Sequence, residues 1–404
     1  MSFLRPVLRR GHRNLRIRQL RGLATATEPA VNHNHQHQAT DNLVKVIEVG
    51  PRDGLQNEKT IIPLTTKIEL IEKLAKTGLT DIEAGSFVAP KWVPQVSHHR
   101  SLPTQRLIIS QMADSSEILE YLLKYPPTSL NPIAYSFLAP NSRGLENALS
   151  ILRAHPSSYQ TFSPQSSPYE ADESAVPDES AAEPTSDPPF IEMSVFAAAT
   201  ESFTQKNLNC DIATSLDRFR EVITGAKAHG LRVKAYISVV LGCPFEGYDV
   251  DPRKVAEMAC DLMEMGADEI DLGDTTGMGT APRTAALLHA MQAAGIRNED
   301  ITMHFHDTYG QALVNSAVSL EHGIRRFDAS VGGLGGCPFS PGATGNVSTE
   351  DLVYFFESLG METGVDLDAL CEVGEWVNGE IGKGNASSVG KALLAKRRRE
   401  AEEA

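Results

Sequence analysis

Residues 232–273 read RVKAYISVVLGCPFEGYDVDPRKVAEMACDLMEMGADEIDLG and contain one complete strand–helix–strand unit. The stretch opens and closes with short apolar runs of the kind that form buried strands. Between these runs, residues 254–266 place apolar side chains at helical spacing. Asp251 and Pro252 are start signals for this helix, and Gly266 is a stop signal. The stretch therefore predicts two neighbouring strands of a parallel sheet that are joined by a helix.

The same alternation extends in both directions over about 290 residues, a length that suits one barrel domain. Another predicted helix, at 66–78, begins with a capping-box pattern formed by Thr66 and Glu69. Eight strands alternating with helices predict a (β/α)8 TIM barrel, an α/β fold. The alternative is a doubly wound open sheet, but no G-x-G-x-x-G fingerprint follows the first strand. The predicted strands are 44–49, 81–85, 132–138, 190–198, 232–241, 269–273, 301–306 and 326–332.

Polar residues lie at the ends of several predicted strands, and their placement favours the barrel. Barrel active sites lie at the rim that the carboxyl ends of the strands form. The polar residues found at these positions are Arg52, Asp53, Glu83, Asp274, His304 and His306. The sequence thus predicts a single site to which several strands contribute.

The amino terminus differs in composition from the rest of the chain. Residues 1–27 contain seven arginines, no lysine and no acidic residue, and they end in small residues. Basic residues that alternate with apolar ones in this way are typical of a mitochondrial transit peptide. Residues 28–43 are predicted to be a linker. We therefore expect the protein to act in the mitochondrial matrix.

The charge balance excludes some classes of partner. The chain has 37 basic and 52 acidic residues, a net charge of −15, and without residues 1–27 the net charge is −22. An acidic body repels a phosphate backbone, which argues against a nucleic-acid partner. No apolar run approaches the ~18 residues of a membrane span, so no membrane partner is expected. The five cysteines form no C-x-x-C motif, which argues against a zinc finger or a disulfide scaffold.

Two segments interrupt the alternation of strands and helices. Residues 156–190 contain seven Pro, eight Ser, seven acidic residues and no Lys or Arg, a composition that predicts a disordered insertion. Because this insertion joins a helix to the next strand, we expect it on the barrel face opposite the rim. Residues 96–110 are predicted to be an irregular insertion. The barrel domain is predicted to span 44–390, including a carboxyl-terminal helical extension, with 391–404 as a charged tail.

Residues at the predicted rim suggest a metal site. His304 and His306 are separated by one residue, so their side chains point to the same face of a strand. Two imidazoles on one face can bind a divalent metal together with the carboxylate of Asp53. A lone Arg–Asp pair is more often a surface ion pair. At a barrel rim, Arg52 and Asp53 become a candidate site for an anion and a cation, and Gly54 is expected to let a substrate approach.

A glycine-rich segment, GGLGGCPFSPGATGN at 332–346, follows the last predicted strand. Its six Gly predict a loop that can move and can approach a ligand closely. Cys337, near its centre, is placed to donate a proton or to act as a nucleophile. Asn346 adds a neutral oxygen at the end of the loop. With Asp53 and the two histidines it completes a mixed nitrogen and oxygen set, which suits Mg²⁺ or Mn²⁺ better than tetrahedral Zn²⁺.

Six motifs occur in the order RDGLQNEK, IEAGSFVAPKWVPQ, LGCPFEG, LGDTTGMGT, HFHDTYGQAL and GGLGGCPFSPGATGNVSTEDLVY. Together they resemble the 3-hydroxy-3-methylglutaryl-CoA lyase family, and the resemblance covers about residues 44–375 apart from the two insertions. The related isopropylmalate and homocitrate synthases share RDG and H-x-H-D. The cysteine-bearing loop and SFVAPKWVPQ separate the lyase family from those synthases.

The resemblance implies a role for each site residue. Asp53, His304, His306 and Asn346 would hold the divalent cation, Arg52 would neutralise the thioester enolate, Cys337 would be the loop acid, Glu83 and Asp274 match polar active-site positions, and Lys59 matches a family lysine near the mouth. The chain departs from the family pattern at Gly85, where the family usually has Thr. It also ends in Glu-Glu-Ala instead of the Cys-Lys-Leu of animal members.

The implied reaction cleaves 3-hydroxy-3-methylglutaryl-CoA to acetyl-CoA and acetoacetate, a step of leucine degradation and ketone-body formation. The resemblance thus implies a CoA thioester substrate, Mg²⁺ or Mn²⁺ as cofactor, and a homo-oligomer, expected to be a dimer. The base that removes the hydroxyl proton is either His304 or Asp274, directly or through water. Two other functions stay open. They are a synthase that condenses acetyl-CoA with a 2-oxo acid, and a metal-binding barrel without catalysis.

Overall fold

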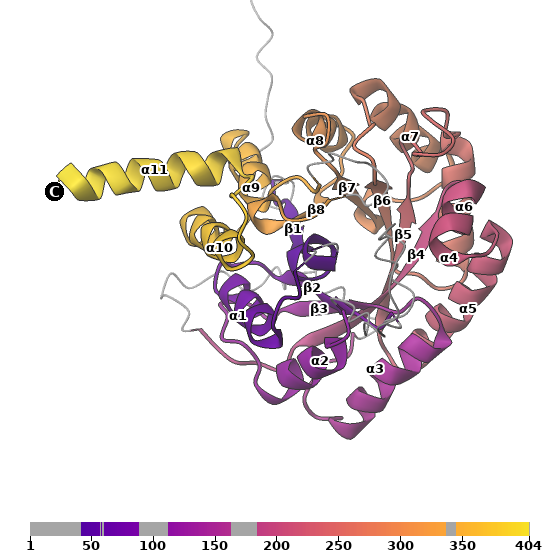
Figure 1. Ribbon diagram of the computed structural model, residues 1–404. Helices are drawn as coiled ribbons and strands as arrows, with labels where there is room; N and C mark the ends of the chain where they lie inside the picture. Colours follow the sequence, from indigo (N-terminus) through magenta and orange to yellow (C-terminus); the bar gives the residue numbers. More distant parts are fainter. Residues whose placement is uncertain are drawn as a thin grey trace, which may run out of the picture. The chain divides into compact units, whose positions relative to one another are not determined.

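The computed structural model describes residues 42–56, 58, 60–88, 112–162, 184–336 and 345–403. Eight parallel strands form a closed barrel in sequence order, and β8 pairs with β1 (Figure 1). The closure excludes the open-sheet alternative, and all eight predicted strands are confirmed. The strands are β1 (Lys45–Glu48), β2 (Asp81–Ser86), β3 (Ala134–Leu138), β4 (Phe190–Ala198), β5 (Arg232–Ser238), β6 (Glu269–Asp274), β7 (Ile301–Phe305) and β8 (Arg326–Ala329).

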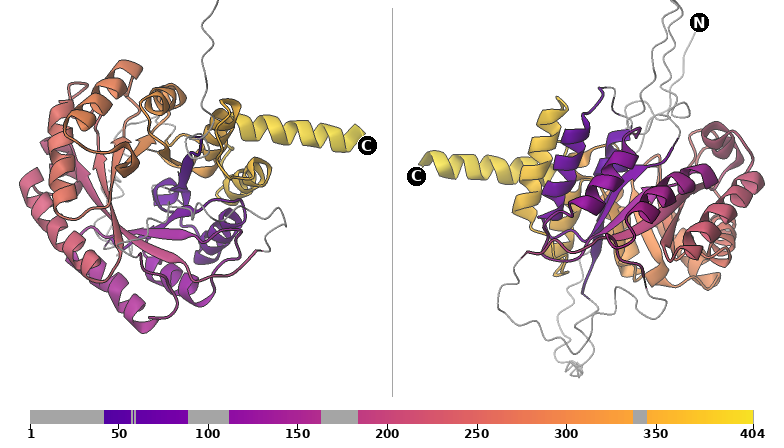
Figure 2. Two further views of the ribbon diagram at one scale, coloured as in Figure 1. Left: turned by 180° about the vertical axis from the view of Figure 1, so that it is seen from behind. Right: turned by 90° about the horizontal axis from the view of Figure 1, so that it is seen from below.

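Helices surround the barrel on its outside, as the views in Figures 1 and 2 show. The helices of the described residues are α1 (Leu64–Ala75), α2 (Ser115–Lys124), α3 (Ser142–Ala154), α4 (Glu201–Leu208), α5 (Ile212–Ala228), α6 (Pro252–Glu264), α7 (Ala281–Ala293), α8 (Ala312–Glu321), α9 (Thr349–Ser358), α10 (Leu367–Glu380) and α11 (Ser388–Glu403), the last of which extends away from the barrel. Short helical turns are η1 (Gly50–Gly54), η3 (Asn298–Asp300) and η4 (Val331–Gly333).

The predicted start and stop signals are confirmed for α6, whereas for α1 the predicted start is wrong and the stop at Gly78, with a φ of +88°, is confirmed. In α6, the side chain of Asp251 accepts a hydrogen bond from the Arg253 amide, and Gly266 has a φ of +109° just after the helix. In α1, the helix begins two residues before the predicted capping residue, Thr66, and has no side-chain cap. The reason is Pro63, whose fixed φ and missing N–H make it a natural boundary before the first turn.

Charged side chains fill one layer of the barrel interior and neutralise one another. Lys45 pairs with Asp81 at 2.6 Å, and Arg326 pairs with Glu269 at 2.6 Å. Lys234 lies 3.4 Å from Glu269. Buried charges persist only where they are paired in this way.

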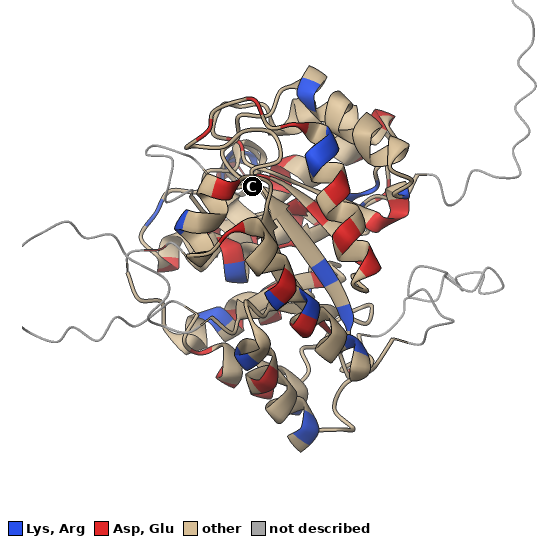
Figure 3. Ribbon diagram, turned by 90° about the vertical axis from the view of Figure 1, so that its right-hand side faces the viewer, with Lys and Arg blue, Asp and Glu red and all other residues tan. Residues whose placement is uncertain are grey.

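Figure 3 shows one side of the molecule, and on that side acidic and basic residues are mixed over the outer helices.

The ends of the Pro/Ser-rich insertion pack against the amino-terminal end of the strands. Ser129 and Thr185 exchange two backbone hydrogen bonds of 2.9 Å, and the Gln160 amide donates to the Pro189 carbonyl at 2.8 Å. The ring of Phe162 stacks on Phe190, with 4.7 Å between centroids. The prediction that all of 156–190 is disordered is therefore wrong at both ends, because these residues find backbone and aromatic partners. Residues 163–183 lie outside the described residues, and so does the predicted insertion 96–110.

Deleting residues 163–183, with a short Gly–Ser linker in their place, is expected to leave kcat/KM within about threefold of the intact chain. The flanking residues enter β4 at its amino-terminal end, whereas barrel active sites lie at the opposite rim. Steady-state kinetics of both proteins test this. The larger deletion 160–186 is expected to lower the melting temperature, because it also removes Phe162 and the Ser129–Thr185 pair. A hundredfold loss in the smaller deletion would contradict the prediction.

The carboxyl-terminal helical extension is confirmed as α10 and α11. Arg397 of α11 pairs with Asp368 and Glu372 of α10, and Arg398 pairs with Glu375 at 2.7 Å. In α11 only Gly390 is buried, and the helix projects away from the barrel in Figure 1, as expected for a charged, solvated tail. Among the described helices, none has the length and apolarity needed to cross a bilayer.

Candidate metal centre and active site

Arg52 and Asp53 lie on a tight turn at the carboxyl end of β1. In this turn, η1, the Val49 carbonyl accepts hydrogen bonds from the amides of Arg52 at 3.2 Å, Asp53 at 2.8 Å and Gly54 at 3.2 Å. The bond from Gly54 closes a π-turn, a geometry that recurs at functional sites. The turn lifts two consecutive charged side chains onto the rim, where the sequence predicts them.

Gly54 has a packing role. A Cβ atom at this position would lie 2.7 Å from Ser330 Oγ and 2.8 Å from Leu334 Cβ, so no larger side chain fits. The expectation that Gly54 makes room for a substrate is therefore wrong. The residue makes room for the start of the glycine-rich segment after β8.

Asp53, His304 and His306 converge at the rim. One potential ligand atom from each lies within 4.8 Å of the others, and the imidazole centroids are 5.3 Å apart. Asn346 joins them because its backbone forms an isolated bridge with His306. Its amide Nδ2 donates to Asp53 Oδ2 at 3.0 Å. The structure thus brings together all four residues of the predicted metal set.

The chemistry of this group fits a divalent cation. Buried His306 Nδ1 and Asn346 Oδ1 have no hydrogen-bond partner among the described residues. Burial and the neighbouring His304 lower the pKa of His306 to about 4, which keeps its ring neutral. Burial would raise the pKa of Asp53, but Arg52 and the histidines lower it overall. A charged carboxylate, two imidazoles and a free amide oxygen are suitable ligands for such an ion.

Arg52 fixes a positive charge beside the candidate metal group. It is only 2% exposed, and its Nη1 and Nη2 lie 2.8 Å from Asp53 Oδ1 and 2.5 Å from Glu83 Oε2. The guanidinium carbon lies 5.3 Å from the ring centre of Tyr236. Arg52 Nε is buried without a partner among the described residues. Glu83 thus orients a cation that retains one free donor.

Asp274 ends β6 in a protected position. Its Oδ2 accepts a hydrogen bond from the Gly279 amide at 2.9 Å, and a Cβ at Gly279 would lie 2.6 Å from that oxygen. Its Oδ1 is buried without a partner in the described part of the chain. Burial raises the pKa of Asp274 to about 7. The carboxylate can therefore exchange a proton near neutral pH.

Comparison with known proteins agrees with this geometry. The HMGL-like family model matches residues 178–377. A Pseudomonas aeruginosa protein named 3-hydroxy-3-isohexenylglutaryl-CoA/hydroxy-methylglutaryl-CoA lyase is 44% identical over 87% of this chain and 98% of its own length. The mitochondrial hydroxymethylglutaryl-CoA lyase of Rattus norvegicus is 41% identical over 86% of this chain and 89% of its own length. The chain belongs to the hydroxymethylglutaryl-CoA lyase family.

A solved structure of a family member supports the same assignment. The crystal structure of the Pseudomonas aeruginosa hydroxymethylglutaryl-CoA lyase aligns with a TM-score of 0.70 at 43% identity, over 88% of this chain and 98% of that one. The predicted family and the TIM-barrel fold are thus confirmed, and the chain is a carbon–carbon lyase by family. Cys337 and Lys59, which the resemblance also singles out, lie outside the described residues.

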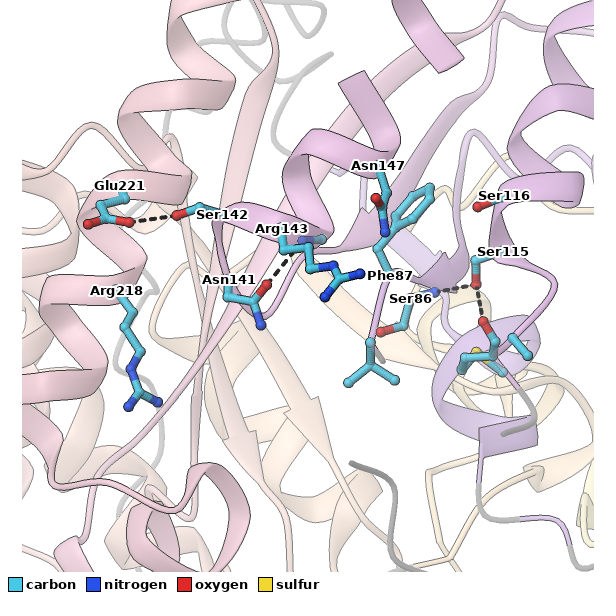
Figure 4. A pocket seen from close by; sticks show the side chains of 14 residues that line it. Ser86, Phe87, Ser115, Ser116, Asn141, Ser142, Arg143, Asn147, Arg218 and Glu221 are labelled. Carbon is cyan, nitrogen blue, oxygen red and sulfur yellow. Dashed lines mark hydrogen bonds between the residues drawn. The ribbon is translucent and has the colours of Figure 1, made fainter. Parts of the chain in front are cut away.

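A cavity of about 860 Å³ lies at the carboxyl ends of β2 and β3 (Figure 4). Its polar lining includes Ser86, Ser115, Asn141, Arg143 and Arg218. Ser86 lies three residues beyond Glu83 on the same strand. The cavity therefore lies near the end of the strand that carries Glu83, and none of the described residues that line it belongs to the candidate metal group.

Gly85, the departure from the family pattern, has a structural reason beside this cavity. A Cβ at Gly85 would lie 2.7 Å from Ser115 Oγ. That hydroxyl accepts a hydrogen bond from the Ser86 amide at 2.9 Å and donates to the Met112 carbonyl at 3.0 Å. A threonine at position 85 would require Ser115 to move.

Two buried carboxylates hold the start of the glycine-rich segment of this lyase-family chain. Glu350 accepts the Gly332 amide with both oxygens, at 3.0 and 2.9 Å. Glu48 accepts the Val331 amide at 2.9 Å and the Thr349 hydroxyl at 2.6 Å. Burial raises the pKa of Glu350 to about 8 and that of Glu48 to about 7. The base of the loop is thus fixed by residues from β1 and α9.

Replacing Glu350 by glutamine is expected to flatten the pH dependence of stability. Between pH 5 and 8 the carboxyl of Glu350 is ionised in the unfolded chain, whereas the folded chain retains its proton. The folded state therefore binds more protons, and the free energy of unfolding falls as pH rises. Glutamine cannot titrate. Urea unfolding of both proteins across this range tests the prediction, with exposed Glu257→Gln as control, and parallel curves for the wild type and Glu350→Gln would contradict it.

The sequence interpretation missed several residues that support the site. Glu48, Lys234 and Asp328 are charged residues inside otherwise apolar predicted strands. Such residues are buried only with partners, so their position in a strand is itself a signal. Glu350 and Tyr236 carry no comparable signal in the sequence, because only the folded barrel shows what they contact.

Proposed function

We propose that this protein cleaves 3-hydroxy-3-methylglutaryl-CoA to acetyl-CoA and acetoacetate with the help of a divalent cation. The observation that carries the proposal is the convergence of Asp53, His304 and His306 beside the buried guanidinium of Arg52. It occurs in a chain that is about two-fifths identical to proteins named as lyases for this substrate. The step would serve leucine degradation and ketone-body formation.

The residues that would hold the cation are Asp53, His304, His306 and Asn346. When bound there, Mg²⁺ or Mn²⁺ would supply Lewis acidity toward the hydroxyl and carbonyl oxygens of the substrate. Asn346 is suited to this role because its Nδ2 is engaged by Asp53, which leaves Oδ1 as the free atom.

Arg52 is positioned to stabilise negative charge. Cleavage of the C2–C3 bond leaves the enolate of acetyl-CoA, whose charge gathers on the thioester oxygen. Glu83 and Asp53 hold two of the guanidinium nitrogens, and the free Nε can donate to that oxygen. A preorganised donor of this kind is commonly worth about 3 kcal/mol of transition-state stabilisation.

Asp274 suits the role of general base better than His304. The His304 ring has its Nδ1 in a hydrogen bond with Asp328, and its other nitrogen is needed as a ligand. Asp274 keeps one buried oxygen without a partner among the described residues, and its pKa of about 7 matches the task. Asp274 would remove the hydroxyl proton directly or through water, and Cys337 would protonate the enolate from the glycine-rich loop.

The cavity beside β2 and β3 is suited to part of the CoA moiety. An Acinetobacter baumannii HMG-CoA lyase, 31% identical and aligned over 87% of this chain and 95% of its own with a TM-score of 0.68, was solved with coenzyme A and 3-methylmalate. In this chain, Arg143 and Arg218 line the cavity, and guanidinium groups bind phosphates well.

Replacing Arg143 by alanine is therefore expected to raise KM several-fold with little change in kcat, because the lost contact is equal in the ground state and the transition state. Steady-state kinetics with the CoA thioester test this. Arg253→Ala, on the exposed start of α6, is the matched control and should leave both constants unchanged. A fall in kcat at constant KM would place Arg143 in the chemistry instead.

The matrix location remains a proposal that the arginine-rich residues 1–27 support. The relatives from Rattus norvegicus and Arabidopsis thaliana are named as mitochondrial, whereas a Mus musculus relative at 40% identity is named as cytoplasmic. We therefore expect the location to depend on the terminal segment. Import of the full chain into isolated mitochondria, compared with a chain lacking residues 1–27, tests this.

The dimer expected from the resemblance is tested by light scattering of the purified chain.

One assay separates the proposed lyase from a condensing synthase. The chain is incubated either with 3-hydroxy-3-methylglutaryl-CoA or with acetyl-CoA and a 2-oxo acid. A lyase forms acetoacetate in the first reaction and releases no free CoA thiol in the second. Thiol release that depends on the 2-oxo acid would identify a synthase, and no turnover in either reaction would leave only metal binding.

A further inference from the structure

His304 lies between two groups of potential ligands, each of which could surround a cation. Above it are Asp53 and His306 at the rim, and below it are Asp271 and Asp328 inside the barrel. Potential ligand atoms within each group lie within 4.8 Å of one another. Because one imidazole has two nitrogens, its orientation decides which group it serves.

The lower group already contains a cation, the ammonium of Lys234. Lys234 Nζ lies 3.3 Å from Asp328 Oδ1, 3.4 Å from Asp271 Oδ2 and 3.4 Å from Glu269 Oε1. The Lys234 side chain is only 4% exposed, and that of Asp328 is fully buried. A metal ion and this ammonium would compete for the same carboxylate oxygens. The lower group is therefore closed to a metal while Lys234 is in place.

Asp328 connects Lys234 to His304. One of its oxygens faces the ammonium, and the other lies 3.0 Å from His304 Nδ1. The backbone enforces this contact, because β7 and β8 pair with His304 opposite Asp328. Among the described residues, His306 Nδ1 has no such partner. The two histidines of the upper group are thus held in different ways.

We propose that Lys234 and Asp328 are positioning residues that hold the proton of His304 on Nδ1 and so assign Nε2 to the metal at the rim. The inference rests on the proposed metal centre. A carboxylate that accepts from the far nitrogen of a ligating imidazole fixes its tautomer and ring orientation. Lys234 orients that carboxylate and keeps the second acidic group from binding a metal of its own.

Asp271→Asn is a matched control for Asp328→Asn. Both carboxylates are buried, lie in the same layer and face Lys234 at nearly the same distance. Each substitution replaces one buried carboxyl group of this layer, facing Lys234, by an amide. Only Asp328, among the described residues, hydrogen-bonds to His304. A general disturbance of this buried layer would therefore weaken metal binding in both variants, whereas loss of the contact to His304 would weaken it in Asp328→Asn alone.

The test measures Mn²⁺ binding to the full chain by the electron paramagnetic resonance signal of free Mn²⁺. The wild type is expected to bind one ion per chain, with the Kd raised about 10–100-fold in Asp328→Asn and changed by less than about threefold in Asp271→Asn. The double variant Lys234→Met, Asp328→Asn restores the charge balance if the single variant folds poorly. It is expected to bind as weakly as Asp328→Asn, because the contact to His304 is still missing.

A second readout needs no metal. In the metal-free wild type, ¹⁵N-histidine resonances are expected to show His304 with its proton on Nδ1, and this preference should be lost in Asp328→Asn. Equal metal affinity in Asp328→Asn and the wild type, equal losses in the two Asn variants, or an unchanged tautomer would overturn the positioning role while the metal centre stands. Two ions per wild-type chain would overturn the role of Lys234. No ion at all would overturn the metal centre itself.

Discussion

Replacing Cys337 by serine is expected to lower kcat by about 10²–10⁴ while KM changes little, because a positioned acid contributes that much to a proton transfer. In the proposed reaction, Cys337 protonates the enolate after the carbon–carbon bond has broken. Serine keeps the size and a hydrogen-bond donor, but its pKa lies far above the ~8.5 of a thiol. Substrate binding should therefore persist while protonation fails.

The described residues on either side of the segment that contains Cys337 agree with this expectation. The described base of its loop is anchored by Glu48 and Glu350, and it leads from β8 to Asn346 at the candidate metal group. Iodoacetamide should inactivate the wild type, and bound substrate should slow the inactivation. Cys260→Ser, on α6, is the control and should retain full kcat. If Cys337→Ser kept more than half of wild-type kcat, the loop would serve closure only.

His306→Ala is expected to lower metal affinity and activity together, by more than the about 10–100-fold that loss of a supporting residue costs. The substitution removes a candidate ligand whose Nδ1 has no hydrogen-bond partner among the described residues, so few other contacts are lost. Excess Mn²⁺ should restore part of the activity, because the remaining three ligands still bind weakly.

Asp53→Ala should show the same loss with less rescue, because Asp53 also holds Arg52 at 2.8 Å and Asn346 at 3.0 Å. Mn²⁺ titration and kinetics on each variant measure both effects. His289→Ala, on the exposed face of α7, is the control. Unchanged metal binding in either site variant would remove that residue from the metal centre.

The strands and the rim could be predicted from the sequence because both follow from local patterns. Each barrel strand is a short apolar run between helices, and the i, i+2 spacing of His304 and His306 fixes their common face. Asn346 could be placed only through the resemblance and the composition of its loop. Its contact with Asp53 spans 293 positions, which no local pattern records.

Three of the sequence predictions are wrong, and each error has a physical reason in the structure. Thr66 looks like a helix cap, but Pro63 already sets the boundary. Gly54 looks like a gap for substrate, but Leu334, far along the chain, fills that gap. Phe162 lies in a segment whose average composition predicts disorder, yet it has its own partner in Phe190. For Gly54 and Phe162 one tertiary contact outweighs the average property of the sequence around it, whereas for Thr66 a stronger local signal precedes it.

In the proposed function, the residues at the rim cleave 3-hydroxy-3-methylglutaryl-CoA with the help of a divalent cation. The most direct measurement incubates the purified chain with this thioester before and after treatment with a chelator, and then with Mn²⁺ added back, while acetoacetate is quantified. We expect acetoacetate and acetyl-CoA in equal amounts, loss of both after chelation, and recovery on addition of Mn²⁺. Acetoacetate formation that survives complete removal of metal would contradict it, as would intact substrate in the presence of Mn²⁺.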